Sequence, residues 1–191
     1  MATPPTPPKP LYIWFSSIVD QRSTDLLINA LTNSFTQGVR EVHLLLSTVG
    51  GGIMNGMTLF NFLRGLPIAL TTHNVGNVDS IGNVIFLAGE HRFACAHSTF
   101  MFHGVAFNTT NPMSFSEQML SESLTTVRSD QRRMANLITE RTKLSEQDVI
   151  VMFGRAATKS AAEALECGII HEIKDVQIPS DAVVASLTAP T

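Results

Sequence analysis

The sequence contains little cysteine and no long apolar run. Its 191 residues include two cysteines, Cys95 and Cys167, which stand far apart and form no CxxC pair. Such spacing provides neither a disulfide framework nor a zinc ribbon, and it favours a reducing, cytoplasmic setting. The apolar stretches are only a few residues long, and the first ten residues carry five prolines in place of an apolar segment. We therefore expect neither a signal peptide nor a membrane span.

Charge is scarce as well, and basic charge in particular. Charged residues make up 15% of the chain, and the formal net charge is −3. The cluster of Arg128, Arg132 and Arg133 alternates with acidic and polar residues, so it offers no continuous basic face for phosphate groups. Nucleic acid is therefore not an expected partner. The low share of charged residues instead predicts that part of the surface is buried in an oligomer.

The six histidines are scattered along the chain and include no pair at positions i and i+4. This spacing gives no indication of a metal site. The glycines do not follow the GxGxxG or GxxxxGK[ST] spacing of nucleotide-binding loops either. The sequence predicts no metal and no cofactor.

Apolar runs rich in β-forming residues alternate with helical patterns in the first half of the chain. Each of three such runs precedes a helical pattern: 11–19 and then 24–38, 40–47 and then 53–65, and 68–75 and then 80–89. This alternation predicts an α/β fold with parallel strands and crossover helices. The predicted domain covers 11–177, between a proline-rich arm over 1–10 and a loosely held, flexible tail over 178–191.

One long helix is the main feature of the second half. We expect short strands at 92–96 and 99–105 and then a helix at about 114–143. At ~1.5 Å per residue this helix runs roughly 40 Å, so we expect it to project from the domain and pack on another subunit. Its apolar positions form a narrow stripe of Met119, Leu120, Leu124, Val127, Met134, Leu137 and Ile138. A helix from about Ser145, a helix at 160–168 and a strand at 169–176 complete the prediction.

Three consecutive glycines follow the second predicted strand. They stand in the turn STVGGG (47–52), which leads into a predicted helix. Glycines at such a turn let the backbone approach a ligand closely and leave N–H groups free to point at an anion. The alternative interpretation is a turn that is merely flexible.

Ser80 and His103 are the two side chains whose positions suggest chemistry. Ser80 stands in GNVDSIG, at the passage from a strand to a helix, where first-turn N–H groups can stabilise an oxyanion. His103 stands in the otherwise apolar strand TFMFHGV, where a neutral imidazole can act as a general base. Each has a structural alternative, because serines commonly cap helices and a strand histidine can be a hydrogen-bonded core residue.

Taken in order, these three features resemble the proteolytic subunit of the Clp protease family. The glycine turn is similar to the family's NSPGG, GNVDSIG to its GQAASMG, and FMFHGV to its IMIHQP. The resemblance continues into SAAEALECG, which is similar to the family's SAEEA segment, and it covers most of 11–173. It implies a Clp-protease/crotonase-like fold of repeated strand–helix units, with 114–143 as a long projecting handle helix.

The resemblance also implies a role for each of these residues. Ser80 corresponds to the nucleophile and His103 to the general base, with the backbone N–H groups of Gly51 and Ile81 as the oxyanion hole. The implied reaction is attack on a peptide carbonyl, formation of an acyl-enzyme, and hydrolysis by water.

Substrate and partners follow from the same resemblance. The family's substrate lies as an added strand beside the glycine turn, which here is Gly51, Gly52 and Ile53. Its handle helix stacks two seven-membered rings into a closed chamber, which implies a homo-oligomer acting on peptides or unfolded proteins. The proline-rich arm does not resemble the family's N-terminal pore loop, so an ATP-driven unfoldase is not an expected partner.

One departure concerns the third member of the catalytic triad. The family has an aspartate shortly before the SAEEA segment, and the corresponding position is Ala156, preceded by Arg155. No carboxylate occurs in GRAATK. In the serine-protease template, loss of this acid lowers turnover by roughly 10⁴ because the imidazole holds the wrong tautomer. The groups that would replace it are Asp148, Asp79, a backbone carbonyl or a water molecule.

Three functions are compatible with these observations. The leading hypothesis is a serine endopeptidase that uses a Ser80–His103 dyad inside an oligomeric chamber. The second is a catalytically impaired structural subunit or scaffold, which the missing aspartate favours. The third is a crotonase-like acyl-CoA enzyme, whose related fold also forms its oxyanion hole from backbone N–H groups after a glycine turn.

Overall fold

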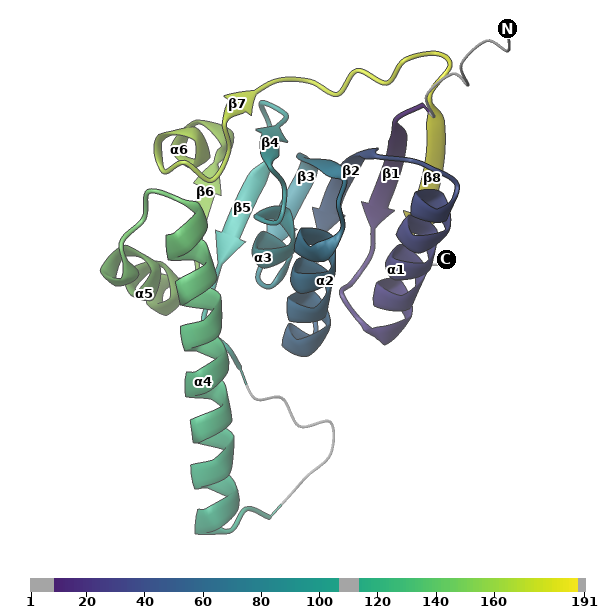
Figure 1. The fold of residues 1–191 in the computed structure, drawn as a ribbon. Coiled ribbons are helices and arrows are strands. Elements are labelled where there is room, and N and C mark those ends of the chain that lie inside the picture. Colours follow the sequence, from purple (N-terminus) through teal and green to yellow (C-terminus); the bar gives the residue numbers. More distant parts are fainter. Residues whose placement is uncertain (1–8, 107–113, 189–191) are drawn as a thin grey trace, which may run out of the picture.

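The computed structural model describes residues 9–106 and 114–188, so most of the predicted proline-rich arm lies outside the described residues. Its centre is a sheet with helices packed against it (Figure 1). The first half of the chain alternates strand and helix: β1 (Leu11–Ser16), α1 (Gln21–Thr36), β2 (Glu41–Thr48), α2 (Ile53–Gly65), β3 (Ala69–Asp79) and α3 (Gly82–Phe86). The predicted α/β class is confirmed.

The second half adds the remaining strands and the long helix. Its elements are β4 (His91–Ala94), β5 (Thr99–Phe102), α4 (Glu117–Arg141), α5 (Glu146–Arg155), β6 (Ala157–Ser160), α6 (Ala161–Glu166), β7 (Glu172–Ile173) and β8 (Val183–Thr188). The sheet has the order β6-β5-β3-β2-β1-β8, and β4 pairs with both β3 and β7. β2, β3 and β5 are parallel to one another, so their carboxyl ends meet at one edge of the sheet.

The strands are held to the helices by alternating apolar residues. In β1, for example, Leu11, Ile13 and Phe15 belong to the main hydrophobic core, whereas Trp14 is 40% exposed. The same core takes in buried residues of α2 and α3, which cover one face of the sheet together with α1 (Figure 1). This packing fixes where the strands end, and hence where the loops at their carboxyl ends lie.

Helix α1 begins earlier than predicted, at Gln21. Asp20 is its N-cap, and the Asp20 carboxylate accepts a hydrogen bond from the N–H of Ser23 at 2.7 Å. The Ser23 hydroxyl accepts from the N–H of Asp20 at 3.0 Å, which completes a capping box. The prediction missed this start because the first turn of the helix is polar.

The predicted long helix is α4, which extends well beyond the sheet (Figure 1). Its 25 residues correspond to about 37 Å. The buried residues Met134, Ala135 and Ile138 all lie in its second half, whereas Leu120 and Leu124 in its first half are 53% and 47% exposed. None of the helices in the described part of the chain combines the length and the apolar character that crossing a bilayer requires.

Strand β6 is a short element that the sequence did not predict. It pairs antiparallel with β5, with Phe102 opposite Ala157 and Met101 opposite Thr158. The strand predicted at 169–176 is reduced to β7, which spans two residues and pairs with β4. Both differences arise because short strands are defined by their pairing and not by a hydrophobic period of their own.

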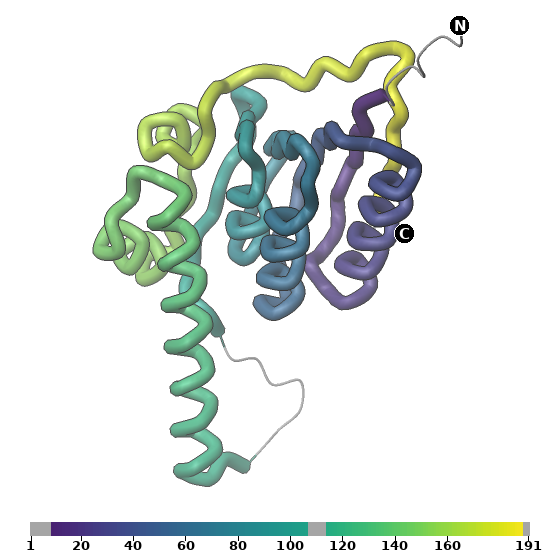
Figure 2. The backbone as a smooth tube through the Cα atoms, viewed as in Figure 1, coloured from purple at the N-terminus to yellow at the C-terminus, as the bar shows by residue number. Residues whose placement is uncertain are grey.

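The end of the chain also differs from the predicted loosely held tail over 178–191. The tube in Figure 2 runs from β7 along one end of the sheet back to β1. There β8 adds a parallel strand beside β1, with Ile13 opposite Ala185 and Phe15 opposite Leu187. The pairing covers the backbone groups of β1 that would otherwise form an open edge. Residues 189–191 lie outside the described part.

Candidate active site

Ser80 lies between β3 and α3 in a left-handed backbone conformation, with a φ of 57°. Its N–H donates to the carbonyl of Met101 at 2.8 Å. The buried side chain of Asn83 donates to the carbonyls of Ser80 at 3.1 Å and Met101 at 2.8 Å. These bonds hold a non-glycine residue in a conformation that costs about 1–3 kcal/mol. A strained turn between strand and helix is the arrangement that exposes the nucleophile of many hydrolases.

The Ser80 hydroxyl does not cap α3 among the described residues. The Ser80 carbonyl accepts from the N–H of Asn83 at 3.1 Å, but no N–H of the first turn donates to the hydroxyl. In the described ranges this hydroxyl has no hydrogen-bond partner and is open to a pocket. The side chain is therefore free to react.

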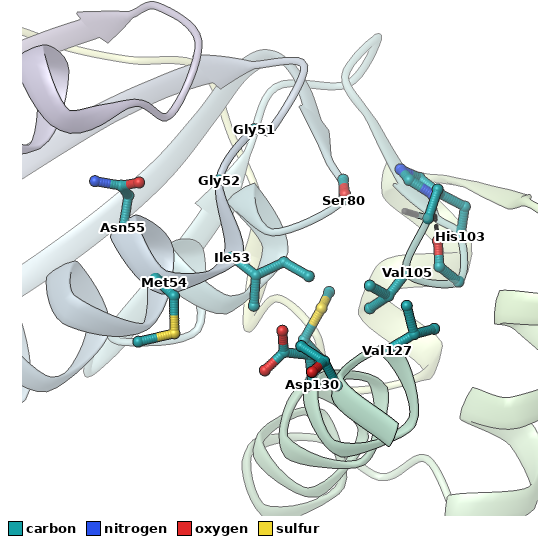
Figure 3. A pocket seen from close by; sticks show the side chains of 14 residues that line it. Gly51, Gly52, Ile53, Met54, Asn55, Ser80, His103, Val105, Val127 and Asp130 are labelled. Carbon is teal, nitrogen blue, oxygen red and sulfur yellow. Dashed lines mark hydrogen bonds between the residues drawn. The ribbon is translucent and has the colours of Figure 1, made fainter. Parts of the chain in front are cut away.

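This pocket has a volume of about 500 Å³ and brings together residues far apart in the sequence (Figure 3). One wall is the glycine turn with the start of α2, a second is the segment after β5, and a third is α4. Its lining residues are Gly51, Gly52, Ile53, Met54, Asn55, Ser80, His103, Gly104, Val105, Ala106, Thr126, Val127, Asp130 and Met134. The predicted nucleophile, base and substrate-binding turn thus share one cavity.

The glycine turn is fixed by the segment that follows β1. The N–H of Val19 donates to the carbonyl of Gly50 at 2.8 Å, and the N–H of Gly52 donates to the carbonyl of Val19 at 2.7 Å. Gly51 lies between these bonds with a φ of 150°, and a Cβ on it would lie 2.2 Å from the Val19 carbonyl oxygen. The turn is therefore held in one conformation, and the interpretation of a merely flexible turn is wrong.

Two backbone donors beside Ser80 are not used within the protein. Within residues 9–106 and 114–188, neither the N–H of Gly51 nor that of Ile81 donates to a backbone or side-chain acceptor. The turn and Ile81 are close together, because a Cβ on Gly50 would lie 3.4 Å from the Ile81 nitrogen and 2.7 Å from the Ser80 Cβ. Unused N–H groups next to a hydroxyl are the donors that an oxyanion requires.

His103 follows β5 and lies across the pocket from Ser80 (Figure 3). Its Nδ1 lies 2.8 Å from the carbonyl oxygen of Gly104. A carbonyl can only accept, so Nδ1 carries the proton and Nε2 is left with a free lone pair. No hydrogen bond joins this imidazole to the Ser80 hydroxyl in the part of the chain that the structure describes. Such bonds are often long in enzymes without substrate and tighten when substrate binds.

Ala156 directly precedes β6, as His103 directly follows β5. The last residue pair of these two antiparallel strands is Phe102 opposite Ala157, so Ala156 and His103 both adjoin that pair. Ala156 ends α5 in a left-handed conformation, with a φ of 49° and a ψ of 52°. The position where the resemblance places a triad aspartate therefore adjoins the same end of the β5–β6 pair as His103, and it carries only a methyl group.

Both acids that were considered as replacements for the triad aspartate form hydrogen bonds with other residues. The Asp148 carboxylate accepts from the hydroxyl and the N–H of Ser145 at the start of α5, and these bonds hold the pKa of Asp148 below its usual value. The Asp79 carboxylate accepts from the side-chain amide of Asn77 at 2.8 Å. In the described part of the chain neither acid makes a hydrogen bond or an ion pair with His103, and the acceptor at Nδ1 is the neutral carbonyl of Gly104.

The sequence did not identify the wall of the pocket that α4 forms. That wall consists of Thr126, Val127, Asp130 and Met134. Val127 and Met134 belong to the predicted apolar stripe, and Asp130 falls between them on the same face of the helix. An acid within an apolar stripe is the sequence feature that could have pointed to this wall. Among the described side chains, no group of three histidines, cysteines, aspartates or glutamates is placed to hold a metal ion.

Comparison with known proteins identifies the family of this chain. A family model described as Clp protease matches residues 10–177. The ATP-dependent Clp protease proteolytic subunit 2 of Corynebacterium diphtheriae is 26% identical over 171 residues, which cover 86% of this chain and 82% of the relative. Subunit 1 of Leifsonia xyli is 22% identical over 169 residues, covering 85% of this chain and 82% of the relative. The chain therefore belongs to the Clp protease family, and this membership supports a serine peptidase at the level of the family.

Proposed function

We propose that the protein is a serine endopeptidase that cleaves peptides or unfolded chains with a Ser80–His103 dyad. The observation that carries the proposal is the convergence of a strained, uncapped serine, a histidine with a free Nε2 and two unused N–H groups on one pocket. In this proposal Gly51 and Ile81 form the oxyanion hole.

The reaction would proceed through an acyl-enzyme. Nε2 of His103 takes the proton of the Ser80 hydroxyl as Oγ bonds to the carbonyl carbon of the scissile peptide. The carbonyl oxygen becomes an oxyanion and accepts hydrogen bonds from the N–H groups of Gly51 and Ile81. Breaking of the C–N bond releases the amine, which receives the proton from His103. Water then attacks the Ser80 ester while His103 takes a proton from it. The ester C–O bond breaks, and Ser80 Oγ receives the proton from His103.

The Gly104 carbonyl takes part of the role of the missing aspartate. Its bond to Nδ1 keeps the tautomer in which Nε2 is a base. A neutral carbonyl stabilises the imidazolium less than a carboxylate does, because charge-assisted hydrogen bonds are roughly twice as strong as neutral ones. We therefore expect a slow peptidase rather than an inert one.

The glycine turn is the proposed binding site for the substrate backbone. An extended peptide would lie beside Gly51, Gly52 and Ile53 and add a strand there, with its carbonyl directed at Ser80. The three residues line the pocket on the side away from His103 (Figure 3). The substrate would therefore lie between the turn and the segment after β5.

A peptidase assay tests this function. Purified protein is incubated with a library of fluorogenic peptides and with unfolded casein, in the presence and absence of a fluorophosphonate. Hydrolysis that the fluorophosphonate abolishes supports the proposal. Absence of both hydrolysis and fluorophosphonate incorporation would instead favour the catalytically impaired structural subunit, for which the methyl group of Ala156 is the supporting observation.

We also propose that copies of the chain assemble through α4 into homo-oligomeric rings, with two heptamers stacked on each other. The exposed apolar residues of its first half leave an unpartnered surface on an element that projects from the domain; they are Met119, Leu120 and Leu124. Burial of such surface is the main driving force of association.

Sedimentation velocity at micromolar concentration tests the assembly. We expect the wild type to sediment as an oligomer, and Leu124→Glu to shift it toward the monomer because a charge would be buried in the interface. Leu165→Glu, on the separate helix α6, is the matched control because Leu165 is also exposed, at 38%. A wild-type protein that remains monomeric would contradict an α4 interface.

A further inference from the structure

We propose that Asp130 makes the pocket beside Ser80 selective for a lysine or arginine side chain on the acyl side of the scissile bond. This inference rests on the proposed peptidase function, because the pocket receives such a side chain only if Ser80 attacks the carbonyl next to it. It assigns a substrate class to that function, namely peptides cleaved after basic residues.

The position of Asp130 supports this role. It lies on α4 and lines the same cavity as Ser80, at the end of the pocket away from His103 (Figure 3). Its side chain is only 16% exposed, so the carboxylate is largely removed from water. A side chain that begins at the carbonyl held by Ser80 and extends into the cavity would approach this carboxylate with its tip.

The surroundings of Asp130 are apolar. Ile53, Val105, Val127 and Met134 line the cavity with it, and Val127 and Met134 stand three and four positions away on the same face of α4. The stem of a lysine or arginine is apolar and packs well against such walls, while its charged tip needs a partner. Asp130 is the one carboxylate among the described residues that line the pocket.

The charge of Asp130 is only partly compensated within the protein. Arg133 Nη1 lies 3.1 Å from Asp130 Oδ1, but the Arg133 side chain is 43% exposed. An ion pair of this kind between residues i and i+3 on a helix contributes little. The same Arg133 nitrogen lies 3.8 Å from Met54 Sδ, so a substrate cation would displace Arg133 from the edge of the pocket. Within the described ranges, Asp130 Oδ2 accepts no hydrogen bond. A substrate cation inside the pocket would be less exposed than Arg133 and would interact more strongly with the carboxylate.

The selectivity follows from the chemistry of a partly buried acid. An acid at the base of a substrate pocket is the device by which trypsin selects basic residues. Hydrogen bonds between a cation and a carboxylate are charge-assisted, and partial shielding from water strengthens them. An apolar side chain of the same length would leave the carboxylate desolvated and without a substrate partner.

The test uses two diphenyl phosphonate probes that differ only in the side chain beside phosphorus. One carries lysine, and the other carries norleucine, which has the same four-carbon stem without the ammonium group. Ser80 Oγ bonds to phosphorus and a phenoxide leaves as phenol, so each labelling event needs a single turnover and no deacylation. Labelling rates are read by intact mass. We expect the lysine probe to label the wild type about tenfold faster than the norleucine probe, and Asp130→Asn to remove this ratio.

Two further variants separate selectivity from other effects. Arg133→Gln removes the competing cation and should raise the lysine-to-norleucine ratio above that of the wild type. Glu122→Gln removes an exposed carboxylate elsewhere on α4 and should leave the ratio as it is. Equal or faster labelling by norleucine in the wild type, or a lysine preference that survives Asp130→Asn, would overturn the assignment while leaving the peptidase function intact. Failure of both probes to label Ser80 would remove the peptidase function and this inference together.

Discussion

Ala156→Asp is expected to raise the peptidase kcat/KM by about 10- to 100-fold. Residues 156 and 103 both adjoin the last residue pair of β5 and β6, so we expect a carboxylate at position 156 to reach the imidazole. Its charge would stabilise the imidazolium that forms when Ser80 is deprotonated. We expect a gain below the 10⁴ typical of this acid, because the Gly104 carbonyl already holds the required tautomer. Hydrolysis of a fluorogenic peptide and the rate of fluorophosphonate labelling measure the gain.

Ala156→Asn is the matched control for this substitution. Asparagine and aspartate both tolerate the left-handed conformation that residue 156 adopts, so the two variants should be equally well folded. Asparagine adds no charge and should increase the activity little. Equal activity of Ala156→Asp and Ala156→Asn would show that the missing acid does not limit the reaction.

Gly51→Ala is expected to slow fluorophosphonate labelling of Ser80 by about 10²–10³, the effect of losing one oxyanion donor. The added Cβ would lie 2.2 Å from the Val19 carbonyl oxygen, and the residue has a φ of 150° that alanine disfavours. The turn must therefore move, and its N–H moves with it. The rate is measured by intact mass, alongside a thermal unfolding curve.

The control for this second substitution is Gly65→Ala. Gly65 ends α2, and a Cβ there would meet nothing within 4 Å among the described residues. We expect Gly65→Ala to label at the wild-type rate. A folded Gly51→Ala protein that also labels at the wild-type rate would exclude the Gly51 N–H from the oxyanion hole.

The parallel part of the sheet was predictable because hydrophobic period and turn residues agree there. Buried runs that alternate with amphipathic helices have few other folds available to them. The strand segments that were not predicted have a common cause. The second half of β3 contains the polar segment GNVD, and it is a strand because Asn77 and Val78 pair with Thr99 and Phe100 of β5. β6 and β8 likewise depend on neighbours that are distant in the sequence.

The resemblance to the Clp protease family grouped the glycine turn, Ser80 and His103 into one candidate site. In the structure each of them follows a strand, and the carboxyl ends of β2, β3 and β5 meet at one edge of the sheet. His103 was predicted inside its strand, but β5 ends one residue before it, at Phe102. The Gly104 carbonyl as the partner of His103 was not predictable in detail, because a backbone acceptor leaves no mark on the sequence. Asp130 was not predicted as a site residue, because it lines the pocket only through the tertiary packing of α4.

Locating a fluorophosphonate adduct by peptide mass spectrometry tests the proposed role of Ser80 most directly. The purified protein is labelled, digested and sequenced, with His103→Ala treated in parallel. We expect one adduct, on the hydroxyl of Ser80, and a strong loss of labelling in His103→Ala because no base remains to accept the proton. A protein that forms no adduct in any assembly state, or forms it at another residue, would contradict the role of Ser80 as the nucleophile.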